Sequence, residues 1–218
     1  MPDDVIPVWN AVLLVFLGAL LGILGPVFTG GIQAKYRNSK IRKAIITELT
    51  EARFRLASIV YILESRFGTR DRKLLEWILP LLENYKGPNP SAKLVELLRK
   101  QLELDDHQLA GLAQYEKAER DGALSVKKYR VPYIESRLAD LGAFNEEAQA
   151  LILDIQWRLS LYNEEIDEAR FYFKLTYEPG VSEENHRRAT QGVESSYRNL
   201  AQMARSIVEQ INKLSPPQ

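Results

Sequence analysis

The sequence predicts an all-α fold with one N-terminal transmembrane helix and a cytoplasmic multi-helix bundle that contains long coiled-coil-like helices. Residues 8–28 form a run of 21 residues without a charged side chain. Elsewhere apolar residues recur in steps of three and four, which is typical of helices. No segment shows the two-residue alternation of a strand, and Asn-Gly hairpin turns are absent. We expect an anchor over 1–31, a helical domain over 32–214 and a disordered tail over 215–218.

The apolar run matches the thickness of a bilayer. As a helix, Val8–Phe28 spans about 31 Å, close to the ~30 Å hydrocarbon core. A secretory signal peptide is the alternative, but it requires a basic N-terminal region and a shorter apolar core. Here Asp3 and Asp4 precede the run. We therefore predict a single-pass transmembrane helix.

Basic residues follow the predicted span and none precedes it. Such a bias places the basic side in the cytoplasm. We expect the N-terminus outside and the chain beyond residue 35 in the cytoplasm, at the inner membrane if the source is bacterial. The bases serve as a stop-transfer flank or, in a second interpretation, also attract anionic lipid headgroups. This membrane-proximal basic flank consists of Lys35, Arg37, Lys40, Arg42 and Lys43.

The composition of the remainder narrows the classes of function. Without the basic flank and the two N-terminal acids, 24 bases oppose 27 acids, a balance that disfavours binding of duplex nucleic acid. The chain has no cysteine, which excludes disulfides, thiolate zinc sites and cysteine nucleophiles.

The first helix of the bundle is predicted from Ile32 to about Phe67, and Gly68-Thr69-Arg70 ends it. Its apolar residues form a narrow stripe of the kind found in coiled coils. The Thr29-Gly30-Gly31 sequence lets this helix continue the membrane helix or turn away from it. The stripe consists of Ile41, Ile45, Leu49, Ala52, Leu56, Ile59 and Leu63.

Short helices are predicted next. Asp71 caps a helix that runs to Tyr85 and is kinked or broken at Pro80. A loop at residues 87–90 follows, and Ser91 caps a helix that runs to about residue 102.

The middle of the chain shows weaker helical patterns. Asp105-Asp106 begins a segment that ends at Asp121-Gly122. Residues 125–141 form a weak helical stretch interrupted by Pro132 and closed by Gly142.

Two long helices complete the predicted bundle. Asn145 caps a helix over 146–177, Glu178-Pro179-Gly180 stops it, and Ser182 caps the last helix. Each has an apolar stripe that either mediates self-association or packs inside the monomer. The first stripe is Ala148, Ile152, Ile155, Leu159, Tyr162, Ile166, Ala169 and Phe173. The second is Ala189, Val193, Tyr197, Leu200, Ala204, Ile207, Ile211 and Leu214.

Glycines in the predicted span suggest self-association. Gly18 and Gly22 form a small-x-x-x-small pair, and Gly25 lies one turn further along. Glycines let membrane helices approach closely, although such pairs also occur by chance in apolar runs.

Two basic–aromatic clusters are candidate contacts for an anionic ligand or a small nucleotide signal. The first is Lys127-Lys128-Tyr129-Arg130, and the second is Arg170 with the following residues Phe171, Tyr172, Phe173 and Lys174. Bases contact phosphates and aromatic rings stack on nucleobases. The alternative is a solvated face beside a core stripe.

No catalytic, metal or cofactor motif is present. His107 and His186 each lie beside acids and could ligate a metal if the fold brought them together, but we expect both to be exposed residues at helix starts. Phosphate-binding glycine loops and nucleophile elbows are also missing. We expect a non-enzymatic protein without metal or cofactor. A cryptic hydrolase or nuclease centred on His186 is a minor hypothesis.

The leading functional hypothesis is a membrane-anchored helical protein that self-associates. Its expected partners are the lipid bilayer, other copies of itself and a cytoplasmic protein or small nucleotide. The alternative is an oligomeric pore or membrane-disrupting effector, for example in prokaryotic antiviral defence. Such a pore would be hydrophobic, because the span offers few polar side chains.

Overall fold

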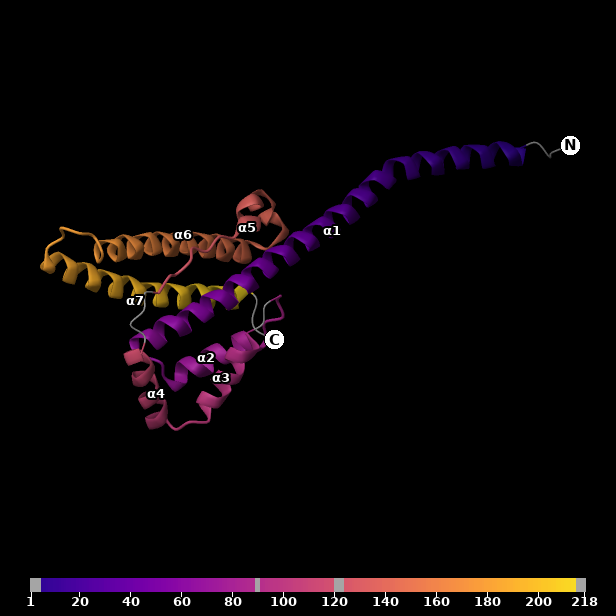
Figure 1. Cartoon of the computed structure of the whole chain (residues 1–218). Coiled ribbons are helices and arrows are strands. Elements are labelled where there is room, and N and C mark those ends of the chain that lie inside the picture. Colours follow the sequence, from indigo (N-terminus) through magenta and orange to yellow (C-terminus); the bar gives the residue numbers. More distant parts are fainter. Residues whose placement is uncertain (1–4, 89–90, 120–123, 215–218) are drawn as a thin grey trace. The chain divides into compact units, whose positions relative to one another are not determined.

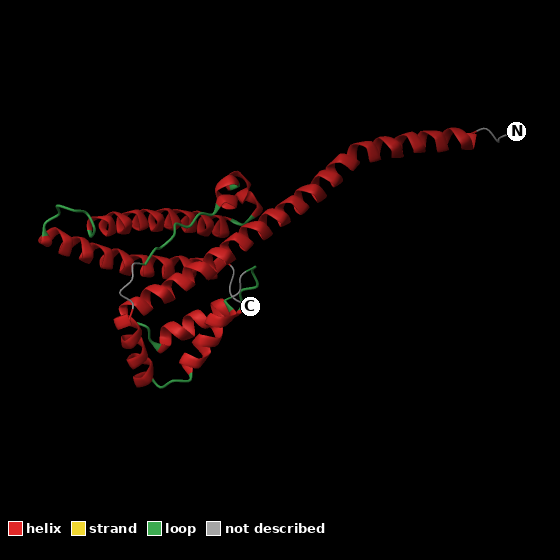
Figure 2. Ribbon diagram, in the orientation of Figure 1, coloured by secondary structure: helices red, strands yellow, loops and turns green. Residues whose placement is uncertain are grey.

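The computed structural model describes residues 5–88, 91–119 and 124–214, and these contain helices and no strand (Figures 1 and 2). This confirms the predicted all-α class and the multi-helix bundle. The elements are α1 (Val5–Phe67), α2 (Arg72–Glu83), α3 (Ala92–Leu102), α4 (Asp106–Glu119), α5 (Pro132–Ser136), the 3₁₀ helix η1 (Leu138–Ala143), α6 (Glu146–Leu175) and α7 (Glu183–Leu214).

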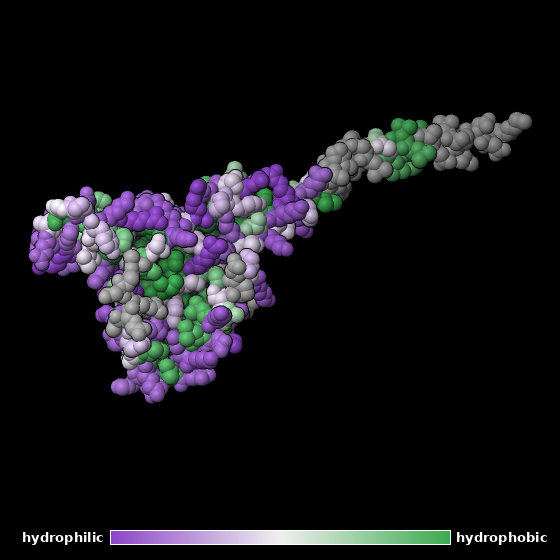
Figure 3. Space-filling model, in the orientation of Figure 1, coloured by the Kyte–Doolittle hydropathy of each residue, from purple (hydrophilic) through white to green (hydrophobic). Residues whose placement is uncertain are grey.

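The chain divides into two compact units, Met1–Ala44 and Ile45–Gln218. The first contains the N-terminal part of α1, which continues through Thr29-Gly30-Gly31 without a break. The apolar side chains of residues 12–17 are 46% to 73% exposed and form the green band on α1 in Figure 3. Among the residues described, no helix combines the length and apolar character that a bilayer crossing requires. Much of the predicted span, including the side chains of residues 8–11 and 20–28, lies outside the described part.

Within the second unit, α1 is buried over a broad face. Arg53, Phe54 and Ala57 are buried as well as the predicted stripe residues Ala52 and Leu56. The prediction of a narrow coiled-coil stripe is therefore wrong for this helix. The reason is that other elements of the same chain pack around α1, so its apolar surface is covered within the monomer.

Helices α6 and α7 pack against each other along the predicted stripes. Six of the predicted residues of α6 are buried, and its remaining surface is largely exposed. Seven of the eight predicted stripe residues of α7, all except Leu214, are also buried, and Ser196, Ala201 and Val208 widen the buried face. A Cβ at Gly192 would lie 2.7 Å from the Tyr172 ring, so a side chain there would clash with the ring. The structure thus favours the intramolecular interpretation of both stripes.

Most predicted helix boundaries are confirmed. Asp71 accepts a hydrogen bond from the Leu74 amide at 2.8 Å, and Asn145 accepts one from the Ala148 amide at 3.0 Å. Gly68 ends α1 in the left-handed region, with φ of 67°.

Two local predictions hold only in part. A kink or a break was predicted at Pro80, and the helix is not broken there, since Pro80 lies inside α2. Ser91 precedes α3 as predicted, but its side chain makes no capping bond because its backbone has φ of −81° and ψ of 59°.

A buried polar cluster joins α1, α3 and α4. The guanidinium of Arg70 is fully buried, donates to Glu116 at 3.1 and 3.2 Å, and donates to the Tyr61 hydroxyl at 2.9 Å. The Tyr61 hydroxyl donates to the Gln101 amide oxygen at 3.4 Å. Arg70 thus connects residues of α1, α3 and α4 through one hydrogen-bonded cluster.

The largest departure from prediction is the segment after α4. Residues 124–131 are extended and not helical, and α5 and η1 follow in place of one weak helix. We call residues 124–131 the strap. Figure 2 shows it as a green segment that runs beside α6 to α5.

Candidate ligand pocket beside the strap

The strap is attached to α6 and α7 by side chains from both helices. The Asn163 amide pairs with the backbone of Tyr129, accepting from its N–H at 2.7 Å and donating to its carbonyl at 2.6 Å. Arg170 donates to the Val126 carbonyl at 3.1 Å, and the Tyr197 hydroxyl donates to the Leu124 carbonyl. An extended segment outside a sheet has no neighbouring strand to bind its backbone N–H and C=O groups, and these side chains supply hydrogen bonds in its place. They hold the backbone of the strap in place.

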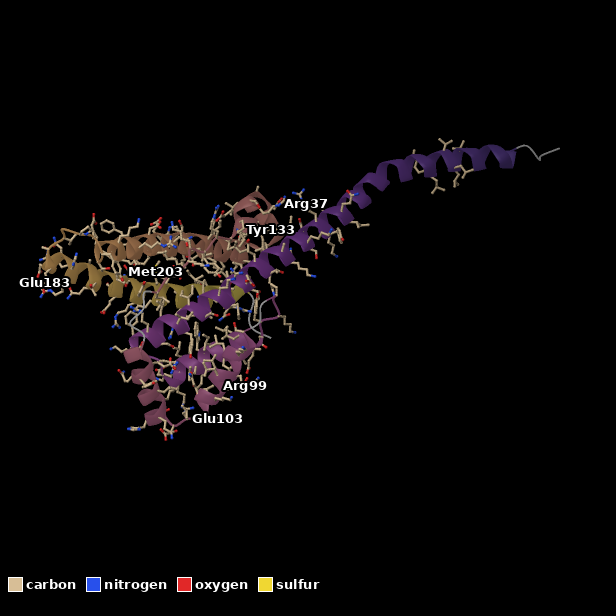
Figure 4. All side chains as sticks on the ribbon, in the orientation of Figure 1. Arg37, Arg99, Glu103, Tyr133, Glu183 and Met203 are labelled. Atoms are coloured by element: carbon tan, nitrogen blue, oxygen red, sulfur yellow. The ribbon has the colours of Figure 1, made fainter. Side chains whose placement is uncertain are left out.

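Helix α1 fixes the far end of the strap, where α5 begins. Both carboxylate oxygens of Glu48 accept backbone hydrogen bonds at 2.9 Å, one from Tyr133 and one from Ile134. Figure 4 labels Tyr133 at this position. Pro132 has no N–H, so Glu48 binds the first two available amides of α5. A carboxylate is favoured there by the positive end of the helix dipole.

A pocket of about 590 Å³ lies between the strap and α1. Ligand sites in proteins have volumes of roughly 300–1,000 Å³. The pocket includes the whole of the first predicted cluster, residues 127–130. Its wall on α1 consists of Phe54, Arg55, Ser58, Ile59 and Ile62, and Ser91 and residues 124–130 complete the lining.

The structure brings the two predicted basic–aromatic clusters to one region, but gives them different roles. Lys127, Lys128, Tyr129 and Arg130 line the pocket. Arg170 instead lines a cavity of about 100 Å³ between the strap, α6 and α7, where it binds the Val126 carbonyl. It therefore supports the strap from α6.

Three of the four cations that line the pocket take part in ion pairs exposed to solvent. Arg55 pairs with Glu51 through Nε, Lys128 pairs with Asp167, and Arg130 pairs with Glu135 at 2.8 Å. Lys127 has no ion-pair partner among the residues that the structure describes. Exposed pairs contribute only about 0–1 kcal/mol each, so an incoming anion can replace an acidic partner at low cost.

Sequence reasoning missed the α1 wall of the pocket. Arg55 and Ile62 do not belong to the predicted stripe. They are far from the strap in sequence, so no local sequence pattern indicates that they line the same pocket. The guanidinium of Arg55 lies 5.8 Å from the centre of the Tyr129 ring, within the range of a cation–π interaction.

The other predicted site residues lie in the first unit. Apart from its chain neighbours and the nearby backbone of its own helix, no described atom comes within 4 Å of a Cβ built on Gly18, while the surroundings of Gly22 and Gly25 lie outside the described residues. All five bases of the membrane-proximal flank are exposed on α1. The Lys40 ammonium lies 4.5 Å from the centre of the Tyr36 ring.

The histidines do not form a common site. His107 is exposed at the start of α4, and the His186 ring lies 3.2 Å from the Glu178 carbonyl. Within the described ranges, no group of three or more histidine, aspartate or glutamate side chains is arranged to hold a metal ion.

No protein-family model matches the chain, and no curated protein or solved structure matches it. The pocket and the N-terminal apolar run are therefore interpreted from their own chemistry.

Proposed function

We propose that this protein is a single-pass, membrane-anchored helical protein that self-associates, with its cytoplasmic bundle acting as an interaction or sensing module. The observation that carries the proposal is the continuity of α1. Its N-terminal part contains the uncharged run Val8–Phe28, and its C-terminal part supplies buried residues to the bundle. One helix thus contributes to both the proposed anchor and the module.

The exposed apolar side chains of α1 support an anchor. Residues 12–17 include Leu14, Val15 and Phe16, which are 67% to 73% exposed. Contiguous exposed apolar surface marks contact with lipid or with another protein. The exposed basic flank favours an orientation with the bundle in the cytoplasm.

The proposed self-association rests on the N-terminal segment. The stripes of α6 and α7 are used within the monomer, so they leave no free seam for a second copy. Gly18 and its open surroundings offer a surface for close helix approach in lipid.

Membrane extraction tests the anchor. We expect the full chain to remain in the membrane pellet after alkaline carbonate washing, and a Val15→Arg/Leu17→Arg variant to appear in the supernatant. Each arginine costs about 2.5–3.5 kcal/mol near the centre of a span. The matched control is Leu97→Arg/Leu138→Arg, two exposed leucines of the bundle. Wild-type protein in the supernatant would contradict the proposal.

Cysteine labelling tests the orientation. Because the chain has no cysteine, single variants report one position each. A membrane-impermeant maleimide added to intact cells should label Asp3→Cys and leave Ser195→Cys unlabelled until lysis. The reverse pattern would place the bundle outside.

Particle mass in detergent tests self-association and separates it from the pore alternative. A mass above that of one chain, reduced by Gly18→Leu/Gly22→Leu, supports self-association, and a single-chain mass contradicts it. Loss of membrane potential on expression would favour a pore. An intact potential at high expression would favour the interaction module.

A further inference from the structure

The pocket beside the strap has the components of a site for a small anion with an apolar body. Four cationic side chains come from two elements: Arg55 from α1, and Lys127, Lys128 and Arg130 from the strap. Among the described residues, Lys127 has no ion-pair partner, and only the Nε atom of Arg55 is paired. These groups supply donors for a phosphate.

Apolar side chains provide the second part of the site. Ile59 and Ile62 lie one turn apart on α1 and line the pocket with Leu124 and Val126. The side chain of Ile62 is 39% exposed, so part of this apolar surface is open to solvent. Covering this surface favours a ligand with a hydrophobic portion.

Tyr129 connects the charged and apolar parts. Asn163 binds both the N–H and the carbonyl of Tyr129, so the main chain that carries the ring is held in place before any ligand arrives. Aromatic faces stack on planar ligand rings, and the neighbouring guanidinium of Arg55 strengthens binding of an anionic group beside the ring.

The wall formed by the strap is also preorganised. Asn163, Arg170 and Tyr197 hold its backbone from behind, and Glu48 holds the start of α5. A ligand therefore does not need to order this segment, which lowers the entropic cost of binding.

We propose that the strap pocket binds an organic phosphate with a planar apolar body, of the size of a mononucleotide. The phosphate replaces the acidic partners of Arg130 and Lys128 and contacts Lys127. The planar body lies against Tyr129 and the isoleucines of α1. This assignment names the ligand class of the proposed sensing module and rests on that proposal for its biological role, whereas binding itself is independent of the membrane anchor.

The test is calorimetric titration of the full chain in detergent with adenosine monophosphate as the probe. We expect binding with a dissociation constant below about 1 mM, and binding of inorganic phosphate and adenosine weaker by about tenfold or more. Similar affinity for inorganic phosphate would overturn the apolar part of the site. Octyl phosphate binding as tightly as adenosine monophosphate would overturn the planar part. No heat of binding up to about 10 mM would overturn the proposal.

Variants locate the site. Lys127→Gln/Arg130→Gln should weaken binding by about tenfold or more, because each charged hydrogen bond contributes substantially to affinity. The matched control is Arg99→Gln/Lys100→Gln, which removes two exposed, paired bases from α3; Arg99 is labelled in Figure 4. Equal affinity of the two double variants would place binding elsewhere. Release of the wild-type chain by the carbonate wash, together with intact ligand binding, would refute the anchor and leave the pocket proposal valid.

Discussion

Replacement of Glu48 tests whether a side chain of α1 caps α5 and so fixes the end of the strap. Each carboxylate oxygen accepts one amide bond at 2.9 Å, from Tyr133 and Ile134. The residue at the capping position of α5, Val131, has no polar side chain and makes no capping bond. Glu48 therefore takes the role that serine or aspartate performs at most helix starts.

The expected cost follows from these two bonds. A hydrogen bond to a charged group contributes about 1.5–3 kcal/mol, and because Tyr133 is a half-exposed residue we expect water to replace part of this contribution after the carboxylate is removed. We expect Glu48→Ala to lower the free energy of unfolding by about 2–3 kcal/mol. Glu48→Gln keeps one acceptor oxygen, so it should cost about half as much. For a domain of this size, the alanine variant should lose about 4–12 °C in Tm.

The assay is thermal unfolding of the full chain in detergent, followed by circular dichroism. Glu194→Ala, at an exposed glutamate of α7, is the control and should change the free energy of unfolding by no more than about 0.5 kcal/mol. The capping argument is refuted if Glu48→Ala is as stable as the control, or if Glu48→Gln costs as much as Glu48→Ala.

Three further predictions concern the bundle. Glu116→Gln should lower the free energy of unfolding by about 3 kcal/mol, because it leaves the positive charge of the buried Arg70 guanidinium without its carboxylate partner. Chemical denaturation measures this change. Arg70→Met/Glu116→Leu, which removes both charges, should lower the free energy of unfolding by less, and a larger decrease would contradict the role of the ion pair. Asn163→Ala removes both hydrogen bonds to the Tyr129 backbone, so it should lower the free energy of unfolding by about 1–2 kcal/mol and increase the rate of trypsin cleavage within the strap. An unchanged cleavage rate would show that the strap is held in place without these bonds. Burial and the Glu51 hydrogen bond raise the pKa of Tyr85 to about 12, so its neutral form stabilises the fold fully below pH ~10, and this contribution is lost as the pH rises towards 12. Burial also raises the pKa of Tyr162 and Tyr197, so several tyrosines contribute to the late part of an ultraviolet titration. Tyr85→Phe should reduce the late tyrosinate amplitude by that of one tyrosine, whereas Tyr177→Phe should leave it unchanged. An unchanged late amplitude in Tyr85→Phe would refute the assignment.

Helix boundaries were predictable where the signal is local. Asp71 and Asn145 bind amides three positions later, and Gly68 adopts a left-handed conformation that terminates α1. Each of these interactions depends on a few consecutive residues, so the sequence pattern contains the information that determines it.

The strap could not be predicted because distant residues determine its conformation. Residues 125–141 have a composition compatible with a helix, whereas Asn163 and Tyr197 hold the extended backbone from 34 and 73 positions away. The same limitation applies to the pocket. Its basic residues were identified from their cluster, but the α1 wall follows only from the tertiary packing that brings Arg55 beside the strap.

The proposed ligand site and the proposed self-association both involve α1. Ligand binding can regulate self-association only under a thermodynamic condition. This helix lines the pocket through Arg55 and Ile62 and contains Gly18 in its N-terminal part. A ligand changes self-association only if it binds the assembled and single chains with different affinity, and the effect is reciprocal. A Gly18→Leu variant that no longer assembles should then bind adenosine monophosphate with altered affinity, although its pocket residues are unchanged. Identical affinities would mean that the pocket and the assembly operate independently, which would remove the sensing role while leaving both sites intact.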